Sequence, residues 1–415
     1  MRRSRVNEAR SSRSRHVLLL SVVFPPDNVS TAHQVDYLAR DLEALGYRVT
    51  VVTTRPHSRP EAQPVMPSDR RSMRIVRIPV FRKSRSALLN ALIWMLFLVG
   101  SLVCGVLGTT KVDIVIAVTP PPGIGLVGAL VARRHRAHLL YNVKELFPDV
   151  AVALRLFDQA FITRSLKWIE DRAFSLSDAV VTVVDGQKAA IARRVPGVRC
   201  LTIPDCVDVD TIVPGIDGSS FRAEWGLTTQ ILVTYAGNLG VPQNIDLLID
   251  ASSLLRDLEP LRIVIIGDGT ERARLAARIE ADGLDNVVLI PQQPFWRVPE
   301  IYAASDLVYV PLAASLGAEA MPSKAYQALA AEKPIVAAAS PESSVISLVR
   351  SSGAGFEVAE LTPRGVADAI RTAVCNSHDL ERMGRLGRQY ILDRYSRRVV
   401  SRDYAKLIDS LMEPR

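Results

Sequence analysis

The chain has 415 residues, of which 48% are hydrophobic and 23% charged, with 23 glycines and 25 prolines. This apolar content excludes an intrinsically disordered chain, and the glycine and proline counts exclude collagen-like and low-complexity classes. The length predicts two or three domains, each with its own core. The four cysteines show no CxxC spacing, so we expect no disulfide scaffold and a reducing compartment.

The formal net charge is +8, and much of the basic excess lies near the N-terminus. Residues 1–15 carry six arginines against one acid, Glu8. We predict a disordered basic tail here, with attraction to anionic lipid as the alternative. The apolar stretch that follows ends at Pro25-Pro26 and has no small-residue cleavage site, so it is not expected to be a signal peptide.

Strands and helices alternate through the first half of the chain. Strands are expected at residues 16–22, 48–53, 112–118, 138–142, 179–184 and 199–203. Helices are expected at 31–46, 87–108, 123–135, 158–176 and 186–194. Strands separated by helices predict a parallel sheet with helices on both faces, which we assign to an N-terminal domain at 16–212.

One segment of this domain, residues 70–108, is unusual in charge and hydropathy. Seven basic residues and no acid lie between Arg70 and Arg85, and the almost wholly apolar run Ala87–Gly108 follows. A helix of about 22 residues is about 33 Å long and could cross a bilayer. A crossing would put strands of one sheet on opposite sides of the membrane. We therefore predict a helix lying in the membrane plane, with a buried core helix as the alternative.

The residues expected at this membrane surface are of two kinds. Basic side chains would face the lipid headgroups, and aromatic side chains would enter the apolar layer. They are Arg82, Lys83, Arg85, Trp94 and Phe97.

The second half repeats the alternating pattern after a Pro/Gly/Ser-rich linker at 213–226. Strands are expected at 231–236, 262–266, 286–290, 307–311 and 334–338. Helices are expected at 243–256, 270–282, 297–304 and 323–332, and through most of the remainder. This is a second α/β domain, at 227–396. Two doubly wound domains predict a cleft between them, with ligands at the carboxyl ends of the strands.

Two glycine-rich turns follow strands of the second domain. Gly237-Asn238-Leu239-Gly240 and Gly267-Asp268-Gly269 each stand between a strand and a helix. Glycine lets the backbone approach an anion closely, and a helix N-terminus offers free N–H groups. We take Gly237, Asn238, Gly240, Gly267 and Gly269 as candidate anion-binding residues. A turn that serves only sharp reversal is the alternative.

The segment Glu319–Gln327 gives the strongest signal for a ligand. Ser323 suits a helix start, and Lys324 would then lie in the first turn, against the partial positive end of the helix dipole. A cation in that place is easier to understand if an anion binds there. Glu319 and Gln327 could hydrogen-bond hydroxyl groups at the same site. An ordinary surface helix start is the alternative.

Candidate acid–base residues lie in the first domain. Glu145 follows a predicted strand, so its carboxylate is expected at the cleft, and a solvated loop is the alternative. His33 lies early in the first helix and could also face the cleft. The six histidines show no HxH or HxxxH pattern, and we expect no metal site. P-loop and nucleophile-elbow motifs are absent from the sequence.

Together these motifs resemble the family 4 retaining glycosyltransferases, in particular the branch that builds bacterial exopolysaccharide, capsule and O-antigen units. The similarity spans roughly residues 16–410. The segments that carry it are Phe24–Asp27, Leu45–Val51, Thr119–Gly123, Asn142–Asp149, Ile203–Asp208, Gly237–Gly240, Ile266–Gly269, Met321–Lys324 and Lys333-Pro334.

The resemblance implies a GT-B fold, in which two Rossmann-like domains face each other across a cleft and the second holds the nucleotide sugar. Residues 397–415 would form a helix that returns to the first domain. Ser323, Lys324 and the Gly237–Gly240 turn would meet the donor diphosphate without a metal or other cofactor. Glu319 and Gln327 would stand where the family's paired glutamates contact the donor sugar and ribose.

The sequence departs from the family pattern at several positions. Gln327 replaces the second glutamate, and Val241–Asn244 lacks the basic residue usual after the glycine turn. Glu145 stands for the usual aspartate, Asp205 for asparagine, and Val29-Ser30 for a glycine pair.

The resemblance implies a membrane-associated glycosyltransferase on the inner face of the cell membrane. It would move a sugar from a nucleotide-diphosphate donor, expected to be a UDP-sugar, to a polyprenyl-diphosphate-linked glycan, with no nucleic acid involved. A catalytically weak sugar-nucleotide-binding protein is one alternative, favoured by Gln327 and by the missing basic residue. A nucleotide-sugar 2-epimerase is another, but it would leave residues 70–108 without a role.

Overall fold

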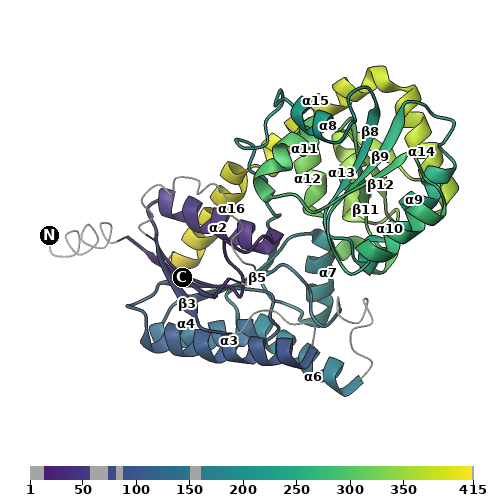
Figure 1. Cartoon of the computed structure of the whole chain (residues 1–415). Helices are drawn as coiled ribbons and strands as arrows, with labels where there is room; N and C mark the ends of the chain where they lie inside the picture. Colours follow the sequence, from purple (N-terminus) through teal and green to yellow (C-terminus); the bar gives the residue numbers. More distant parts are fainter. Residues whose placement is uncertain (1–13, 57–72, 81–86, 150–159, 414–415) are drawn as a thin grey trace. The chain divides into compact units, whose positions relative to one another are not determined.

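The computed structural model describes residues 14–56, 73–80, 87–149 and 160–413 (Figure 1). The chain divides into two compact units. Residues 1–203 and 400–415 form the first unit, and residues 204–399 form the second. Each unit is an α/β domain built on one parallel sheet.

The first unit contains a seven-stranded sheet in the order β3-β2-β1-β4-β5-β6-β7. Its strands are β1 (His16–Leu20), β2 (Arg48–Thr54), β3 (Arg74–Ile78), β4 (Ile114–Val118), β5 (His138–Val143), β6 (Ala179–Thr182) and β7 (Cys200–Thr202). All pairings are parallel, with Leu18 opposite Thr50 on one side and Val115 on the other. Strands β1 and β4 are buried along their whole length because helices cover both faces.

The helices of this unit lie on two sides of the sheet (Figure 1). They are α2 (Ser30–Ala44), α3 (Ala87–Leu107), α4 (Ile124–His135), α6 (Ala160–Leu176), α7 (Asp185–Arg194) and α16 (Arg397–Met412), of which residues 400–412 belong to this unit. Helices α3, α4 and α6 lie together on one side, with α4 packed against both of the others. On the other side, Tyr404 of α16 accepts a hydrogen bond of 2.8 Å from Asn142 Nδ2 on β5.

The edge strand β3 lies within the stretch that we interpreted as a basic membrane stripe. Arg77 on this strand donates hydrogen bonds to the carbonyls of Thr54 (3.0 Å) and Pro25 (2.6 Å), so its charge serves the fold. The stripe is therefore partly a sheet edge. The predicted lipid contacts Arg82, Lys83 and Arg85 lie outside the described residues.

Helix α3 is buried on one face only. Phe97 is 0% exposed and packs into the core of the first unit together with Ile78, so its predicted insertion into lipid is wrong. Trp94 is half-buried, and its ring meets the Phe147 ring edge-on at a centroid distance of 6.2 Å. The opposite face stays exposed, as at Met95 (58%). Because one face of α3 packs against the sheet, only the side chains on its opposite face can contact another partner.

The second unit contains a six-stranded parallel sheet in the order β10-β9-β8-β11-β12-β13. Its strands are β8 (Ile231–Ala236), β9 (Leu261–Ile266), β10 (Val287–Ile290), β11 (Leu307–Pro311), β12 (Ile335–Ala338) and β13 (Gly355–Glu357). The chain order reverses between β8 and β11, which makes the carboxyl ends of these two strands the topological switch point.

Eight α-helices and three 3₁₀ helices accompany this sheet in the described part of the second unit. The α-helices are α8 (Ser219–Glu224), α9 (Asp246–Ser253), α10 (Arg272–Ala281), α11 (Val298–Ala304), α12 (Ser323–Ala330), α13 (Ser344–Ser352), α14 (Pro363–Cys375) and α15 (Ser377–Arg394). The 3₁₀ helices are η1 (Val241–Gln243), η2 (Phe295–Arg297) and η3 (Ala314–Glu319).

The segment 213–226, expected to be a linker, contains α8 and belongs to the second unit. Phe221 on this helix is 1% exposed and packs in a cluster with Leu232 and Ile301. A side chain buried in this way fixes the segment to the domain. The division between the units falls at Ile203 and Pro204 instead.

Candidate active site

The two glycine-rich turns lie against each other at the carboxyl ends of β8 and β9. Gly237 N–H donates to Ile266 O (2.9 Å), and Leu239 N–H donates to Asp268 O (2.8 Å). A Cβ atom at position 267 would lie 1.9 Å from Gly237 O, so only glycine allows this approach. The structure thus brings together the candidates Gly237, Asn238, Gly240, Gly267 and Gly269.

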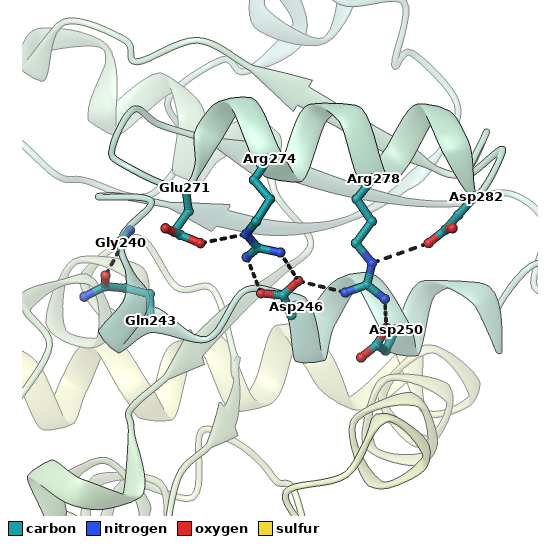
Figure 2. A network of polar contacts seen from close by, with 8 residues as sticks. All are labelled: Gly240, Gln243, Asp246, Asp250, Glu271, Arg274, Arg278 and Asp282. Carbon is teal, nitrogen blue, oxygen red and sulfur yellow. Dashed lines mark hydrogen bonds and ion pairs between the residues drawn. The ribbon is translucent and has the colours of Figure 1, made fainter. Parts of the chain in front are cut away.

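The amide groups of the first turn are largely used within the unit. Gly240 N–H donates to Gln243 Oε1 at 3.2 Å (Figure 2). Asn238 Nδ2 lies 3.4 Å from the same oxygen. Gln243 therefore caps an amide that the sequence assigned to an anion. In the described structure, an anion that uses Gly240 N–H has to replace the Gln243 oxygen.

Next to this turn, an ion-pair network joins α9 to α10 (Figure 2). Arg274 pairs with both carboxylate oxygens of Asp246 and with Glu271, and Arg278 pairs with Asp246, Asp250 and Asp282. Hydrogen bonds from Arg274 lower the pKa of Asp246. Because these arginines are bound by carboxylates, their charge is balanced inside the second unit.

Lys324 is in a different situation, at the first turn of α12. Its ammonium group is partly buried, lying 4.4 Å from the centre of the Tyr235 ring and 3.3 Å from Tyr235 OH. A Cβ atom at position 237 would lie 3.3 Å from Lys324 Nζ, so the charge stands beside the glycine turn. Burial lowers the pKa of Lys324 to about 8. Among the residues that the structure describes, no carboxylate pairs with it.

Tyr235 contacts Lys324, and two more buried tyrosines, Tyr302 and Tyr309, lie near Tyr235; the sequence analysis did not identify these three. Tyr235 OH donates to Asn238 O (2.6 Å), and Tyr302 OH donates to Gln327 Oε1 (3.2 Å). Tyr309 OH is buried and has no hydrogen-bond partner among the residues that the structure describes. Burial raises the pKa of Tyr235, Tyr302 and Tyr309, so all three stay neutral and none can balance the lysine charge.

The remaining second-unit candidates lie on the same stretch of chain. Glu319 ends η3, and Ser323 begins α12, whose eight residues include Gln327 on the second turn. Helix α12 follows β11, so it starts at the switch point where the Gly237–Gly240 turn also lies. The structure therefore places Ser323, Lys324 and the turn in one region of the second unit.

In the first unit, Glu145 is exposed in the loop after β5. The hydroxyl of Thr119, at the end of β4, shapes this loop by accepting from the backbone N–H groups of Lys144 (2.8 Å) and Glu145 (3.2 Å). Thr119 was part of a motif, but this structural role needs the adjacency of β4 and β5. His33 lies on α2, within 3.5 Å of Asn28 Oδ1, and burial lowers its pKa.

Comparison with known families decides the identity of this pair of domains. The model "Glycosyl transferase 4-like domain" matches residues 31–206, and "Glycosyl transferases group 1" matches residues 219–390. The chain belongs to the family 4 glycosyltransferases. The resemblance inferred from the motifs is therefore confirmed.

Curated relatives of this glycosyltransferase align over parts of their length. It is 32% identical over 99 residues to the putative colanic acid biosynthesis glycosyl transferase WcaI of Escherichia coli K12, covering 24% of each chain. It is 29% identical to the D-inositol 3-phosphate glycosyltransferase of Nocardia farcinica, over 45% of this chain and 42% of the relative. The probable glycosyltransferase WbjE of Pseudomonas aeruginosa is 23% identical over 65% of this chain and 68% of its own length. The first two alignments thus span less than half of the relatives.

Solved structures show the same fold at low sequence identity. Sucrose-phosphate synthase from Thermosynechococcus elongatus superposes with a TM-score of 0.77 at 17% identity, covering 96% of this glycosyltransferase and 99% of the other chain. HepE of Anabaena, solved in complex with UDP-glucose, gives 0.68 at 16% identity, covering 95% and 99%. The predicted GT-B fold class is therefore confirmed.

Proposed function

We propose that this protein transfers a hexose-type sugar from a UDP-sugar to a polyprenyl-diphosphate-linked glycan. The observation that carries the donor part is the Lys324 ammonium, partly buried beside the glycine turn with no carboxylate partner among the described residues. A buried charge is costly unless an opposite charge compensates it. A diphosphate at the α12 N-terminus would compensate this cation and accept hydrogen bonds from the helix amides.

The reaction breaks the bond between the sugar C1 and the diphosphate oxygen, and it forms a bond from C1 to an acceptor hydroxyl oxygen. Negative charge develops on the leaving diphosphate as the first bond breaks. Lys324 and the α12 N-terminus would stabilise this charge, which is an electrostatic form of catalysis. The proposal includes retention of the anomeric configuration and needs no metal.

For the acceptor side, we assign Glu145 to position the hydroxyl group or take its proton, with His33 as the second candidate. A positioned acid–base group typically contributes about 10²–10⁴-fold in rate. The hydrogen bonds from the backbone N–H groups of Lys144 and Glu145 to Thr119 fix the backbone position of Glu145 in the loop. Glu319 and Gln327 would hydrogen-bond the donor sugar and ribose. Gln327 would form its hydrogen bond through a neutral side-chain amide, whose oxygen already accepts a hydrogen bond from Tyr302 OH.

Two kinds of observation support a lipid-linked acceptor. The relative in Escherichia coli is named for colanic acid biosynthesis, and α3 of this chain keeps an exposed apolar face. We place the protein in the cytoplasm, peripheral at the inner face of the membrane. A catalytically weak nucleotide-sugar-binding protein is the second candidate, favoured by Gln327 and by the Gln243 cap on Gly240.

A two-step experiment tests the proposal. A panel of nucleotide sugars and UDP is screened for thermal stabilisation, since a ligand that binds only the folded state raises the melting temperature. The stabilising donor is then supplied, radiolabelled, with a membrane lipid extract. Label in the lipid phase supports the transferase. Stabilisation without transfer supports the binding protein, and no stabilisation by any donor contradicts the nucleotide site.

A further inference from the structure

We infer that α3, α4 and α6 form one docking surface for an anionic lipid bilayer, and that this surface adjoins the Glu145 loop. The inference extends the proposed function, because a lipid-linked acceptor is presented at a bilayer surface. It uses residues of α6 that the sequence did not single out.

Exposed apolar side chains are concentrated on these helices. Of the nineteen large hydrophobic side chains exposed in the described part of the chain, seven lie on α3, one on α4 and three on α6. Soluble surfaces rarely keep such residues in one contiguous patch without a partner. The residues that carry the argument are Met95 (58%), Val99 (56%), Val103 (51%), Leu107 (78%), Phe161 (80%) and Trp168 (66%).

The three helices form one continuous layer. A Cβ atom at Gly105 of α3 would lie 2.7 Å from Val131 of α4, so these two helices are in close contact. A Cβ atom at Gly123, just before α4, would lie 3.7 Å from both Leu98 of α3 and Ile169 of α6. Figure 1 shows the helices on the same side of the first-unit sheet.

The side-chain charges of the three helices that are not buried or paired are all positive. The three helices carry two acids. Glu170 is buried and accepts from Tyr141 OH (2.7 Å) and Gly123 N–H (2.8 Å), and Asp171 pairs with Arg194 (2.8 Å). The basic side chains of α4 and α6 make no ion pair with any residue that the structure describes. They are Arg133, Arg134, Arg164, Lys167 and Arg172.

This combination favours anionic lipid over other occupants. Two copies of the chain would bring like charges together, whereas a bilayer offers an apolar layer beneath negative headgroups. The packing of α3 argues against a spanning helix, although α3 is long and apolar enough to cross. Ile93 (3%) and Phe97 (0%) lie on its buried face, and Phe97 packs in the core of the first unit, so we expect the opposite face to enter lipid.

Direct contacts link the surface to the Glu145 loop. Trp94 of α3 meets Phe147, two residues after Glu145, at 6.2 Å between ring centres. Arg194 donates to Phe147 O (3.2 Å) and pairs with Asp149 (2.6 Å) and with Asp171 of α6 (2.8 Å). Docking of α3 and α6 would therefore hold this loop at the interface, where an acceptor diphosphate lies.

Flotation with lipid vesicles tests the surface. The full chain is mixed with vesicles of phosphatidylcholine alone or with phosphatidylglycerol added, at low and high salt. We expect binding to the anionic vesicles that weakens with salt but persists. Neutralising Arg164, Lys167 and Arg172 to Gln should lower the partition coefficient by about fivefold per charge at low salt.

Apolar variants provide the matched comparison. The double variant Phe161→Ser/Trp168→Ser should lose binding at both salt concentrations. Trp296→Ser removes another exposed tryptophan (54%, against 66% for Trp168) from the second unit and should bind as the wild type does. Equal binding by all three proteins, or equal loss in both variants, overturns the inference.

Stabilisation by UDP is measured in parallel. If UDP does not stabilise the wild type, the proposed donor site is contradicted and the flotation result still stands. If UDP stabilisation is lost only in the double variant, that variant is misfolded. The flotation result of Arg164→Gln/Lys167→Gln/Arg172→Gln then decides whether the surface binds lipid.

Discussion

Replacing Lys324 by methionine should make the free protein more stable and its nucleotide binding weaker. The pKa of Lys324 falls from 10.5 to about 8 because burial disfavours its charged form. Below pH 8 the lysine is charged in both states, so the folded state carries the full desolvation cost. A shift of this size corresponds to at most about 3.4 kcal/mol, and to less because the ammonium is only partly buried. Methionine keeps most of the volume and removes the charge.

The pH dependence gives the sign of the effect. As the pH rises from about 8 towards 10.5, Lys324 loses its proton in the folded state before it does so in the unfolded state. The wild type therefore gains stability over this range, and the advantage of Lys324→Met shrinks to nothing. Denaturant unfolding of both proteins across this range measures the difference.

Binding of UDP should change in the opposite direction. A lost charge-assisted hydrogen bond costs about 1.5–3 kcal/mol, so UDP affinity should fall by about ten- to hundredfold. Lys333→Met is the matched control. Burial also lowers the pKa of Lys333, but its ammonium donates to Ala303 O (3.2 Å), away from the turn. The reasoning is refuted if Lys324→Met destabilises the protein below pH 8, or if it binds UDP as tightly as Lys333→Met does.

Three further substitutions test the remaining assignments. Glu145→Gln should lower turnover by about 10²–10⁴-fold and leave UDP stabilisation unchanged, and wild-type turnover would move the role to His33. Gln243→Ala frees Gly240 N–H for a ligand and should raise UDP affinity by about two- to tenfold in calorimetry. Unchanged or weaker binding would mean that Gln243 only stabilises the turn. Trp94→Ala should raise KM for a lipid-linked acceptor without changing UDP affinity, and an unchanged KM would separate α3 from acceptor positioning.

Most of the two sheets could be predicted from the sequence, because their central strands are apolar runs between turn residues. The 231–236 strand is observed with the same bounds, and helix 31–46 is observed as α2. The edge strands β3 and β13 were missed. Strand β3 carries two arginines and β13 has three residues, so both depend on pairing with β2 and β12 rather than on their own composition.

The candidate site was predictable where a motif stands on a turn or helix start. The Gly237–Gly240 turn and Lys324 each carry such a signal, and the sheet order brings them together at β8 and β11. Tyr235 beside Lys324 and the neighbouring Tyr302 and Tyr309 gave no signal in the sequence, because their proximity depends on how β8, α11 and β11 pack. Phe97 was assigned to lipid because an almost wholly apolar helix does not show which face it buries.

The central claim is that Lys324 holds the diphosphate of a sugar donor during transfer to lipid. The most direct measurement is transfer of radiolabelled sugar from the stabilising nucleotide donor into a membrane lipid extract, for the wild type and for Lys324→Met side by side. We predict lipid-bound label with the wild type and at most about one tenth of that rate with Lys324→Met. Equal rates for the two proteins would contradict the account.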